Sequence, residues 1–385
     1  MATRQRTREY WAEYTRDLRT TDFQNLFTRD TPEAYRYFVR GLDVGKLVTG
    51  PWYRRWWMHT KIAFHAFTRR LTPARRLLYA FGVGATLIGM INLFQGVGAS
   101  MSVGSARIWV PTPHWAPGAF WMLLGFAAVN LLMLMEVADR LSLKGELEIA
   151  RDIQLAMLPS GAQRAGDTII AGVTRPANTV GGDLYDIQPL PDGRMMIALG
   201  DVAGKGSPAA LLMALLVAML RTLVDEGLDA ASLVARLNVQ VARHSPASRF
   251  ITLFFGIYDP QTGQLEFVNA GHLPPLLRRV DGTIDRIETP DAGGIALGMF
   301  DEARYTSQTM TIERGEIFVL YSDGITEAEN TAGVPFEEPG LRAVIASDLT
   351  GEPAALGRTI LTAVEMHAGD ARLGDDLTAL VLQRG

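Results

Sequence analysis

Five aspartates of this sequence stand beside glycine or next to an apolar run, where backbone can approach a ligand closely. They are Asp183 in GGDLYD, Asp201 in GDVAGKG, Asp323 in YSDGITE, and Asp375 with Asp376 in GDDLTAL. A single aspartate of this kind usually caps a turn, but several that converge would repel one another and lose hydration. Oxygen clusters are the ligands that hard divalent cations prefer. The pattern therefore predicts a Mg²⁺ or Mn²⁺ site.

Two other kinds of site are excluded by composition and spacing. The chain has no cysteine, which excludes thiolate nucleophiles, disulfides, zinc–thiolate sites and iron–sulfur clusters. The segment GDVAGKGS at 200–207 is similar to a phosphate-binding loop, but Leu199 and Gly206 stand where that motif requires glycine and a hydroxyl residue. Any metal must therefore be held by oxygen or imidazole, and no nucleotide is expected at this loop.

The elements that would position the acids lie in residues 161–385, where short apolar runs alternate with glycine, aspartate, asparagine and proline. Runs at 194–199, 316–321 and 377–382 are predicted strands beside the acids. Residues 209–224 are a predicted core helix, because Arg221 interrupts the apolar stretch too early for a membrane span. This pattern predicts an α+β fold of two antiparallel sheets with helices packed outside.

Six segments together resemble the SpoIIE/RsbU-type protein serine/threonine phosphatases, the bacterial branch of the metal-dependent type-2C phosphatases. The resemblance covers about residues 148–385 and implies an α-β-β-α sandwich with two Mn²⁺ or Mg²⁺ ions at one end. The segments are DIQLAMLP (152–159), GGDLYD (181–186), GDVAGKG (200–206), NAGHLPP (269–275), YSDGITE (321–327) and GDDLT (374–378).

The resemblance also implies roles for the acids. Asp201 would contact both metals, Val202 would offer its backbone carbonyl, and Asp323 and Asp375 would each complete the shell of one metal. Asp183 would hold a water on the metal, and Asp376 is included among the expected ligands. Asp201, Asp323 and Asp375 are the expected catalytic residues. Two metals that activate a water need no phosphoenzyme, so the lack of cysteine is consistent with this chemistry.

The sequence departs from the eukaryotic type-2C pattern in two ways. Ala203 stands where those enzymes carry a histidine thought to protonate the leaving group, and no clear counterpart of their phosphate-binding arginine is present. His272 is the only histidine within a signature segment. Its setting in NAGHLPP favours a turn with structural hydrogen bonds over a catalytic acid.

Residues 77–97 and 117–135 are two uncharged apolar runs, each long enough to cross ~30 Å of hydrocarbon as a helix. They predict a transmembrane hairpin within residues 77–136. A soluble hairpin of core helices is the alternative. The positive-inside rule places both chain ends in the cytoplasm, because basic residues flank the outer ends of the hairpin: Arg69, Arg70, Arg75, Arg76, Arg140 and Lys144. Three prolines in the connector favour a turn over a sensory domain.

Residues 1–76 are basic and aromatic, whereas the rest of the chain is acidic and the net charge is −4. The segment WYRRWW at 52–57 is typical of a helix on anionic headgroups. A nucleic-acid site would also combine arginine with aromatics, but we expect no nucleic acid so close to a membrane anchor. His59 and His65 are expected to be interfacial side chains.

Residues 137–160 are a predicted linker helix that ends before a proline. Leu143, Leu147, Ala150, Gln154 and Met157 recur at coiled-coil spacing, which predicts a homodimer through this helix. The alternative is an amphipathic helix docked on its own domain.

These observations predict a multi-pass phosphatase of the bacterial cytoplasmic membrane. It would hydrolyse phosphoserine or phosphothreonine of a phosphorylated regulatory protein, such as an anti-sigma-factor antagonist. The alternatives are a catalytically silent scaffold that binds a regulatory partner, and a hydrolase of small phosphorylated molecules.

Overall fold

The structure is a computed structural model. It describes residues 51–53, 58, 61, 68, 71–94, 96–103, 106–113, 115–245, 249–288, 293–348 and 351–385. The chain divides into two units, Met1–Leu141 and Ser142–Gly385. The predicted interfacial segment 52–57, with His59 and His65, lies largely outside the described residues.

The N-terminal unit contains two long apolar helices that pack closely. Helix α6 (Pro73–Phe94) and the first part of α7 (Trp115–Met157) meet through small residues. A Cβ on Gly125 would lie 2.3 Å from Thr86 Oγ1 and 2.6 Å from the carbonyl oxygen of Gly82, so only glycine permits this approach. Small residues at such contacts are typical of helix pairs in membranes.

The connector between these helices is a β-hairpin. Strands β1 (Gly96–Val103) and β2 (Ala106–Pro113) pair antiparallel, from Gly96 with Pro113 to Val103 with Ala106. The helix is shifted from the predicted run 77–97, because α6 begins at Pro73 and ends at Phe94, and the connector predicted as a turn is a two-stranded ribbon. The two strands contain three valines with Ile108, Trp109 and Thr112, residue types that favour strands. Pro111 and Pro113 stand in β2, which has one strand partner among the described residues, so the missing N–H is tolerated, whereas Pro117 lies in the first turn of α7.

Helix α7 continues without a break from the second apolar run through the predicted linker to Met157. By length and composition, α6, α7 and α8 (Ser207–Val224) could each cross a membrane. Helix α8, however, belongs to the C-terminal unit and buries one face among other residues of that unit. The prediction of a core helix at 209–224 is therefore confirmed.

Two sheets form the centre of the C-terminal unit. Sheet I has the strand order β10 (Ile284–Arg286), β9 (Leu276–Arg278), β13 (Ile317–Tyr321), β14 (Leu377–Arg384), β4 (Thr168–Arg175), β3 (Gln163–Ala165). Sheet II has the order β11 (Gly293–Gly294), β8 (Gln264–Ala270), β7 (Ile251–Tyr258), β6 (Met195–Val202), β5 (Leu184–Pro189), with β12 (Gln308–Thr311) paired to β8. All pairs are antiparallel except the two-residue pairing of β11 with β8.

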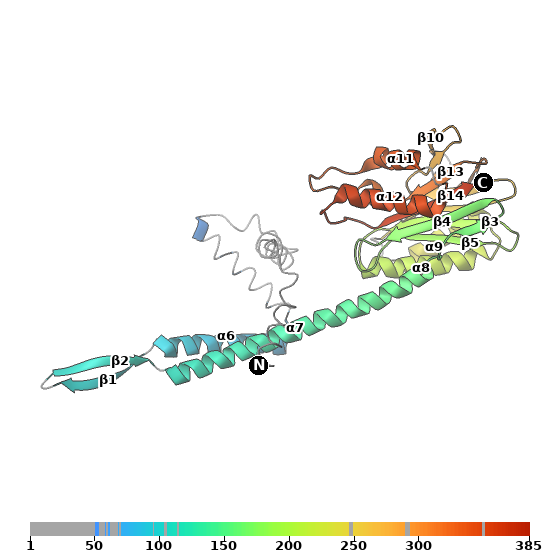
Figure 1. Ribbon diagram of the computed structural model, residues 1–385. Coiled ribbons are helices and arrows are strands. Elements are labelled where there is room, and N and C mark those ends of the chain that lie inside the picture. The colour runs from blue at the N-terminus through green and yellow to red at the C-terminus, as the bar shows by residue number, and fades with distance from the viewer. Residues whose placement is uncertain are drawn as a thin grey trace, which may run out of the picture. The chain divides into compact units, whose positions relative to one another are not determined.

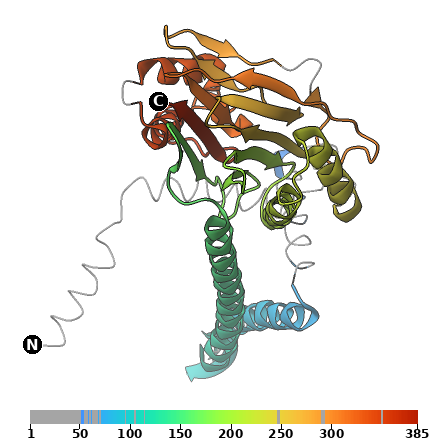
Figure 2. The ribbon, with the colours of Figure 1, turned by 90° about the vertical axis from the view of Figure 1, so that its right-hand side faces the viewer.

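Helices cover the outer faces of both sheets. Helices α8 and α9 (Ala230–His244) pack on sheet II, while α11 (Glu337–Ser347) and α12 (Pro353–Ala368) lie on the side of sheet I (Figures 1 and 2). The residues of β13 and β14 alternate accordingly. Ile317, Val319 and Tyr321 face the helices, whereas Phe318 and Leu320 face sheet II.

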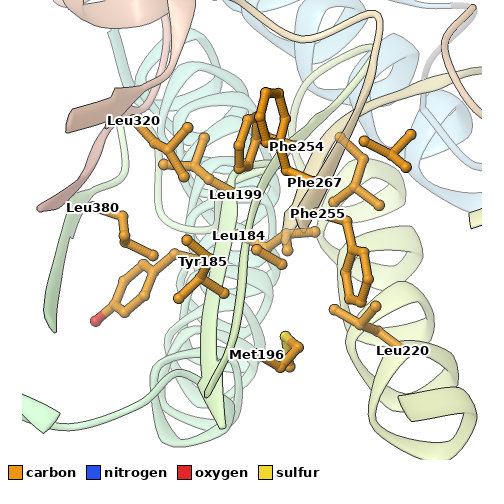
Figure 3. Close-up of a cluster of buried hydrophobic side chains, with 14 of the residues drawn as sticks. Leu184, Tyr185, Met196, Leu199, Leu220, Phe254, Phe255, Phe267, Leu320 and Leu380 are labelled. Carbon is orange, nitrogen blue, oxygen red and sulfur yellow. The ribbon is translucent and has the colours of Figure 1, made fainter. Parts of the chain in front are cut away.

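The core between the sheets consists of large apolar side chains from both. Leu320 and Leu380 of sheet I approach Leu199 and Tyr185 of sheet II, and Phe255 turns the other way toward Leu220 of α8 (Figure 3). Phe254 stacks on Phe267 with ring centroids 5.1 Å apart. The predicted α+β architecture of two antiparallel sheets between helices is confirmed.

Candidate active site

Two of the predicted acids come from the adjacent strands β5 and β6. Asp201 and Val202 end β6, and Asp183 directly precedes β5. Leu184 pairs with Gly200, so one further step along the register places Asp183 opposite Asp201. Asp183 is buried, with 4% of its surface exposed, and its Oδ2 has no hydrogen-bond partner among the described residues.

The other three acids come from turns at the ends of β13 and β14 in sheet I. Asp323 begins the short helix α10 (Asp323–Thr326) after β13, and Asp375 and Asp376 precede β14. Ser322 joins the two turns, because its N–H donates to the carbonyl of Thr378 (2.9 Å) and its Oγ donates to the carbonyl of Asp376 (3.1 Å). A Cβ on Gly324 would lie 2.1 Å from that same carbonyl oxygen, so the approach requires glycine.

Asp376 connects the two sheets at the site. Its Oδ2 accepts a hydrogen bond from the backbone N–H of Gly182 (2.6 Å), and its Oδ1 accepts one from that of Ala177 (2.8 Å). Both carboxylate oxygens of this buried side chain therefore hold backbone in place. The sequence segment GDD could not indicate this role, because the donors lie almost two hundred residues away in the chain.

The carboxylates of the site raise one another's pKa. Burial and the nearby Asp323 and Asp375 raise the pKa of Asp201 to about 7. Burial and Asp201 raise the pKa of Asp183 well above its ordinary value, and burial with Asp375 raises that of Asp323. Shifts of this kind report acids that converge in a poorly hydrated place. Strongly perturbed acids in a cluster are typical of functional sites.

The donor set fits hard divalent cations. Its ligands would be carboxylate and backbone oxygens, and the unsatisfied Oδ2 of Asp183 is a buried acceptor that a cation would complete. A bound cation would also offset the repulsion that raises the pKa of Asp201. Among the described residues, no three acidic or histidine side chains lie close enough to share one ion. The fit therefore rests on the chemistry of the donors and not on a complete coordination shell.

Two basic side chains at the site were missed by sequence reasoning. Lys205 Nζ lies 2.9 Å from Asp375 Oδ2 and donates to the carbonyl of Gly374 (2.5 Å). Arg249 Nη1 donates to the carbonyl of Ala203 (2.9 Å). Lys205 stands within the signature GDVAGKG, which was a usable signal, whereas Arg249 lies in no signature segment. Lys205 joins the turn after β6 to the turn before β14.

Comparison with known proteins identifies the family. Residues 191–385 match the family described as Stage II sporulation protein E (SpoIIE). Over 243 residues the chain is 30% identical to the phosphoserine phosphatase RsbU of Bacillus subtilis, an alignment that covers 63% of this chain and 71% of RsbU. The chain belongs to the SpoIIE family of PP2C-type serine/threonine phosphatases. The predicted family and enzyme class are thus confirmed.

One further relative and one solved structure are also similar to this chain. The chain is 27% identical over 283 residues to Protein IcfG of Synechocystis, but it covers only 44% of IcfG. The SiaA-PP2C domain of Pseudomonas aeruginosa superimposes with a TM-score of 0.54 at 21% identity, covering 64% of this chain and 98% of that domain. This last similarity supports the fold alone.

His272 has the structural role expected of it within this SpoIIE-family domain. Its backbone N–H donates to Asn269 Oδ1 (2.7 Å), and its ring lies 3.1 Å from Thr252 Oγ1 and 3.2 Å from the carbonyl oxygen of Tyr321. Burial lowers the pKa of His272 to about 4. The ring is therefore neutral at pH 7 and connects sheet II to sheet I.

Substituting His272 by glutamine tests this role. We expect the free energy of unfolding to fall by about 1–3 kcal/mol, because buried groups lose their partners. We expect kcat at saturating metal to fall less than ~10-fold, whereas loss of a general acid costs ~100-fold or more. Urea unfolding and steady-state kinetics measure the two effects. A kcat loss of ~100-fold in a protein of unchanged stability would identify a catalytic acid instead.

Proposed function

We propose that this chain is a membrane-anchored, metal-dependent phosphatase that hydrolyses phosphoserine or phosphothreonine of a bacterial regulatory protein. The convergence of carboxylates from β5, β6, β13 and β14, which raises the pKa of Asp201 to about 7, is the observation that carries the proposal. The similarity to RsbU, whose name is phosphoserine phosphatase, supports the substrate class. An anti-sigma-factor antagonist is a candidate substrate.

The proposed ligands follow the family pattern. Asp201 would contact two Mn²⁺ or Mg²⁺ ions, Val202 would contribute its carbonyl, and Asp323 and Asp375 would each hold one ion. When bound, two such ions lower the pKa of water and stabilise charge on the transferring phosphoryl group. Asp183 would hold and orient water from its position opposite Asp201.

Asp376 receives a different role from the one predicted. Because both of its oxygens accept backbone hydrogen bonds, we assign it to positioning the loop before β5 and not to direct ligation. Lys205 would hold the turn containing Asp375 against the turn after β6 and offset part of the negative charge there. Its side chain is half-exposed, so a phosphoprotein could approach it.

The test of this function is metal-dependent release of phosphate. With the full chain in detergent, we expect chelation to abolish release from a phosphoserine protein, and Mn²⁺ or Mg²⁺ to restore it. A free phosphomonoester serves as the comparison substrate and should be hydrolysed more slowly. Activity indifferent to chelator would contradict the proposal, no release from any phosphoprotein would favour the silent scaffold, and preference for the phosphomonoester would favour the small-molecule hydrolase.

The proposed membrane anchor is the pair formed by α6 and the first part of α7. Their apolar composition, their exposed large side chains and the close contact through Gly82 and Gly125 support it. Arg75 pairs with Asp139 (2.7 Å) at the end of the hairpin opposite the β1–β2 ribbon, where we place the cytoplasm. Recovery of the chain in a salt-washed supernatant instead of the membrane pellet would contradict this proposal.

The proposed homodimer would use the part of α7 beyond residue 141. Leu143, Ile149 and Ile153 are exposed there, which supports a partner helix. Gln154 and Met157 have the predicted coiled-coil spacing, but they contact their own domain. The dimer surface must therefore differ from the predicted stripe. Crosslinking from a cysteine introduced at Leu143 tests it, and a monomer at all concentrations would exclude it.

A further inference from the structure

Three side-chain contacts hold the end of helix α7 and the residues directly after it against the rest of the C-terminal unit. Gln154 is hydrogen-bonded to Gly181, Arg221 Nη2 donates to the carbonyl of Met157 (2.6 Å), and Tyr185 Oη donates to the carbonyl of Pro159 (3.0 Å). Arg221 also pairs with the buried Asp186 of β5 (2.8 Å). Only the contact made by Gln154 reaches the loop that carries Asp183.

Gln154 is a buried polar residue on an amphipathic helix. It is 7% exposed, whereas its neighbour Ile153 is 60% exposed and Leu155 is 40% exposed. A helix usually places apolar residues on its buried face, and a buried amide is unfavourable unless it is hydrogen-bonded. Here both ends of the amide are hydrogen-bonded, because Nε2 donates to the carbonyl of Gly181 (2.7 Å) and Oε1 accepts from the N–H of Gly181 (3.1 Å).

The loop 181–183 is thus held from two sides. On one side, Gln154 of α7 is hydrogen-bonded to Gly181. On the other side, Asp376, in the turn before β14, accepts a hydrogen bond from the N–H of Gly182. The following residue, Asp183, has its buried carboxylate opposite Asp201. Gly181 is only two residues before Asp183. A shift of α7 against the domain would therefore move the loop backbone next to this carboxylate.

We propose that Gln154 is a positioning residue that fixes loop 181–183, and through it the carboxylate of Asp183, in the arrangement that binds metal. The seating of α7 and the metal affinity of the site are then coupled through one side chain. This inference rests on the proposed function, since it concerns the same metal site. Arg221 and Tyr185 attach α7 to β5 and α8 without contacting the loop.

The experiment compares Gln154→Met with Tyr185→Phe in the full chain purified in detergent. Each substitution removes one attachment of α7 and keeps the size of the side chain. Phenylalanine also keeps the ring that packs against Gly172. We expect Gln154→Met to weaken Mn²⁺ binding ~10-fold or more, the size of effect found for partners of metal ligands. Tyr185→Phe should change it less than ~2-fold.

Two further measurements separate positioning from a general loss of stability. Calorimetric titration with Mn²⁺ gives the metal affinity of each variant. Thermal unfolding in chelator gives Tm, which both substitutions should lower by a similar amount. At saturating Mn²⁺, kcat of Gln154→Met should return to within ~10-fold of the wild-type value. Mn²⁺ affinity that is unchanged in Gln154→Met, or reduced equally in both variants, would overturn the inference.

The remaining outcomes are also decisive. If Gln154→Met does not fold, Gln154→Glu keeps the length and the acceptor for the N–H of Gly181, and the same criteria apply. If neither variant folds, Gln154 serves stability alone and the inference is wrong. A wild-type chain that neither binds Mn²⁺ nor releases phosphate would overturn the proposed function and this inference with it. Wild-type activity with an unaffected Gln154→Met would overturn the inference alone.

Discussion

Replacing Asp201 by asparagine is expected to abolish phosphate release and, in the presence of chelator, to stabilise the fold at neutral pH. The loss of activity should exceed ~100-fold, because even the partners of metal ligands are worth 10–100-fold. The gain in stability follows from the pKa of Asp201, which burial, Asp323 and Asp375 raise to about 7. Asp201→Asn should therefore lose activity and at the same time gain stability.

The sign of the effect follows from proton linkage. The pKa of Asp201 is about 7 in the folded state against an ordinary value of 3.8, so the native state binds more protons than the unfolded state between these two pH values. Stability is thus highest below that window and falls as the pH rises through it. The raised pKa of Asp201 therefore lowers the free energy of unfolding at pH 8 by at most a few kcal/mol, at about 1.4 kcal/mol per pKa unit.

Thermal unfolding at pH 5 and pH 8 in chelator measures this effect. Asp201→Asn should unfold at a higher temperature than the wild-type chain at pH 8, and the difference should shrink at pH 5. Asp259→Asn is the matched control, since Asp259 directly follows strand β7 but its pKa is lowered by hydrogen bonds from Thr262 and Gln261. Retained activity, or a lower Tm than wild type at pH 8, would contradict the role of Asp201.

Asp375→Ala and Asp376→Ala are expected to fail in different ways, although the two residues are adjacent. Asp376→Ala leaves the N–H groups of Ala177 and Gly182 without their acceptors. Each such buried group costs about 1–3 kcal/mol, so this variant should be destabilised by several kcal/mol. Asp375 is partly exposed and pairs with Lys205, and an exposed pair contributes ~1 kcal/mol at most.

Urea unfolding in chelator and Mn²⁺ titration distinguish the two variants. Asp375→Ala should unfold close to the wild-type denaturant concentration and lose Mn²⁺ affinity and activity by more than ~100-fold. In Asp376→Ala the main effect should be a lower stability. Its activity should fall as a consequence, because loop 181–183 is displaced. Equal stability of the two variants would mean that Asp376 does not hold the loop.

Local patterns in the sequence predicted much of the fold. Apolar runs at 250–258 and 264–269 on either side of DPQTG predict a hairpin, and β7 and β8 do pair around residues 259–263, where Asp259 accepts hydrogen bonds from Gln261 and Thr262. The strands that precede Asp201 and Asp323 also lie where the apolar runs predicted them. Strands and hairpins depend on residues close together in the chain. The alternation of apolar residues and the residue types of the turn are therefore enough to predict them. The individual role of each acid, in contrast, was implied only by the family resemblance.

Other features depended on partners distant in the chain. Gln154 fitted a coiled-coil stripe by spacing, but its hydrogen bonds are to Gly181, so the docked-helix alternative is correct for the end of α7. Asp376 was grouped with Asp375 by adjacency, yet its partners lie in residues 177–182. Spacing along the chain cannot report such contacts, because they are decided by which strands become neighbours in the sheets.

The position of β14 has a consequence for the order of synthesis. This strand lies between β13 and β4 in sheet I, and Asp375 and Asp376 immediately precede it. A ribosome completes every strand of sheet II long before it reaches residue 375, so the nascent chain carries β4 with one edge unpaired. An unpaired edge at that stage is prone to pairing with other chains. A partly made chain also lacks β14 and the two aspartates before it until residues 375–384 emerge.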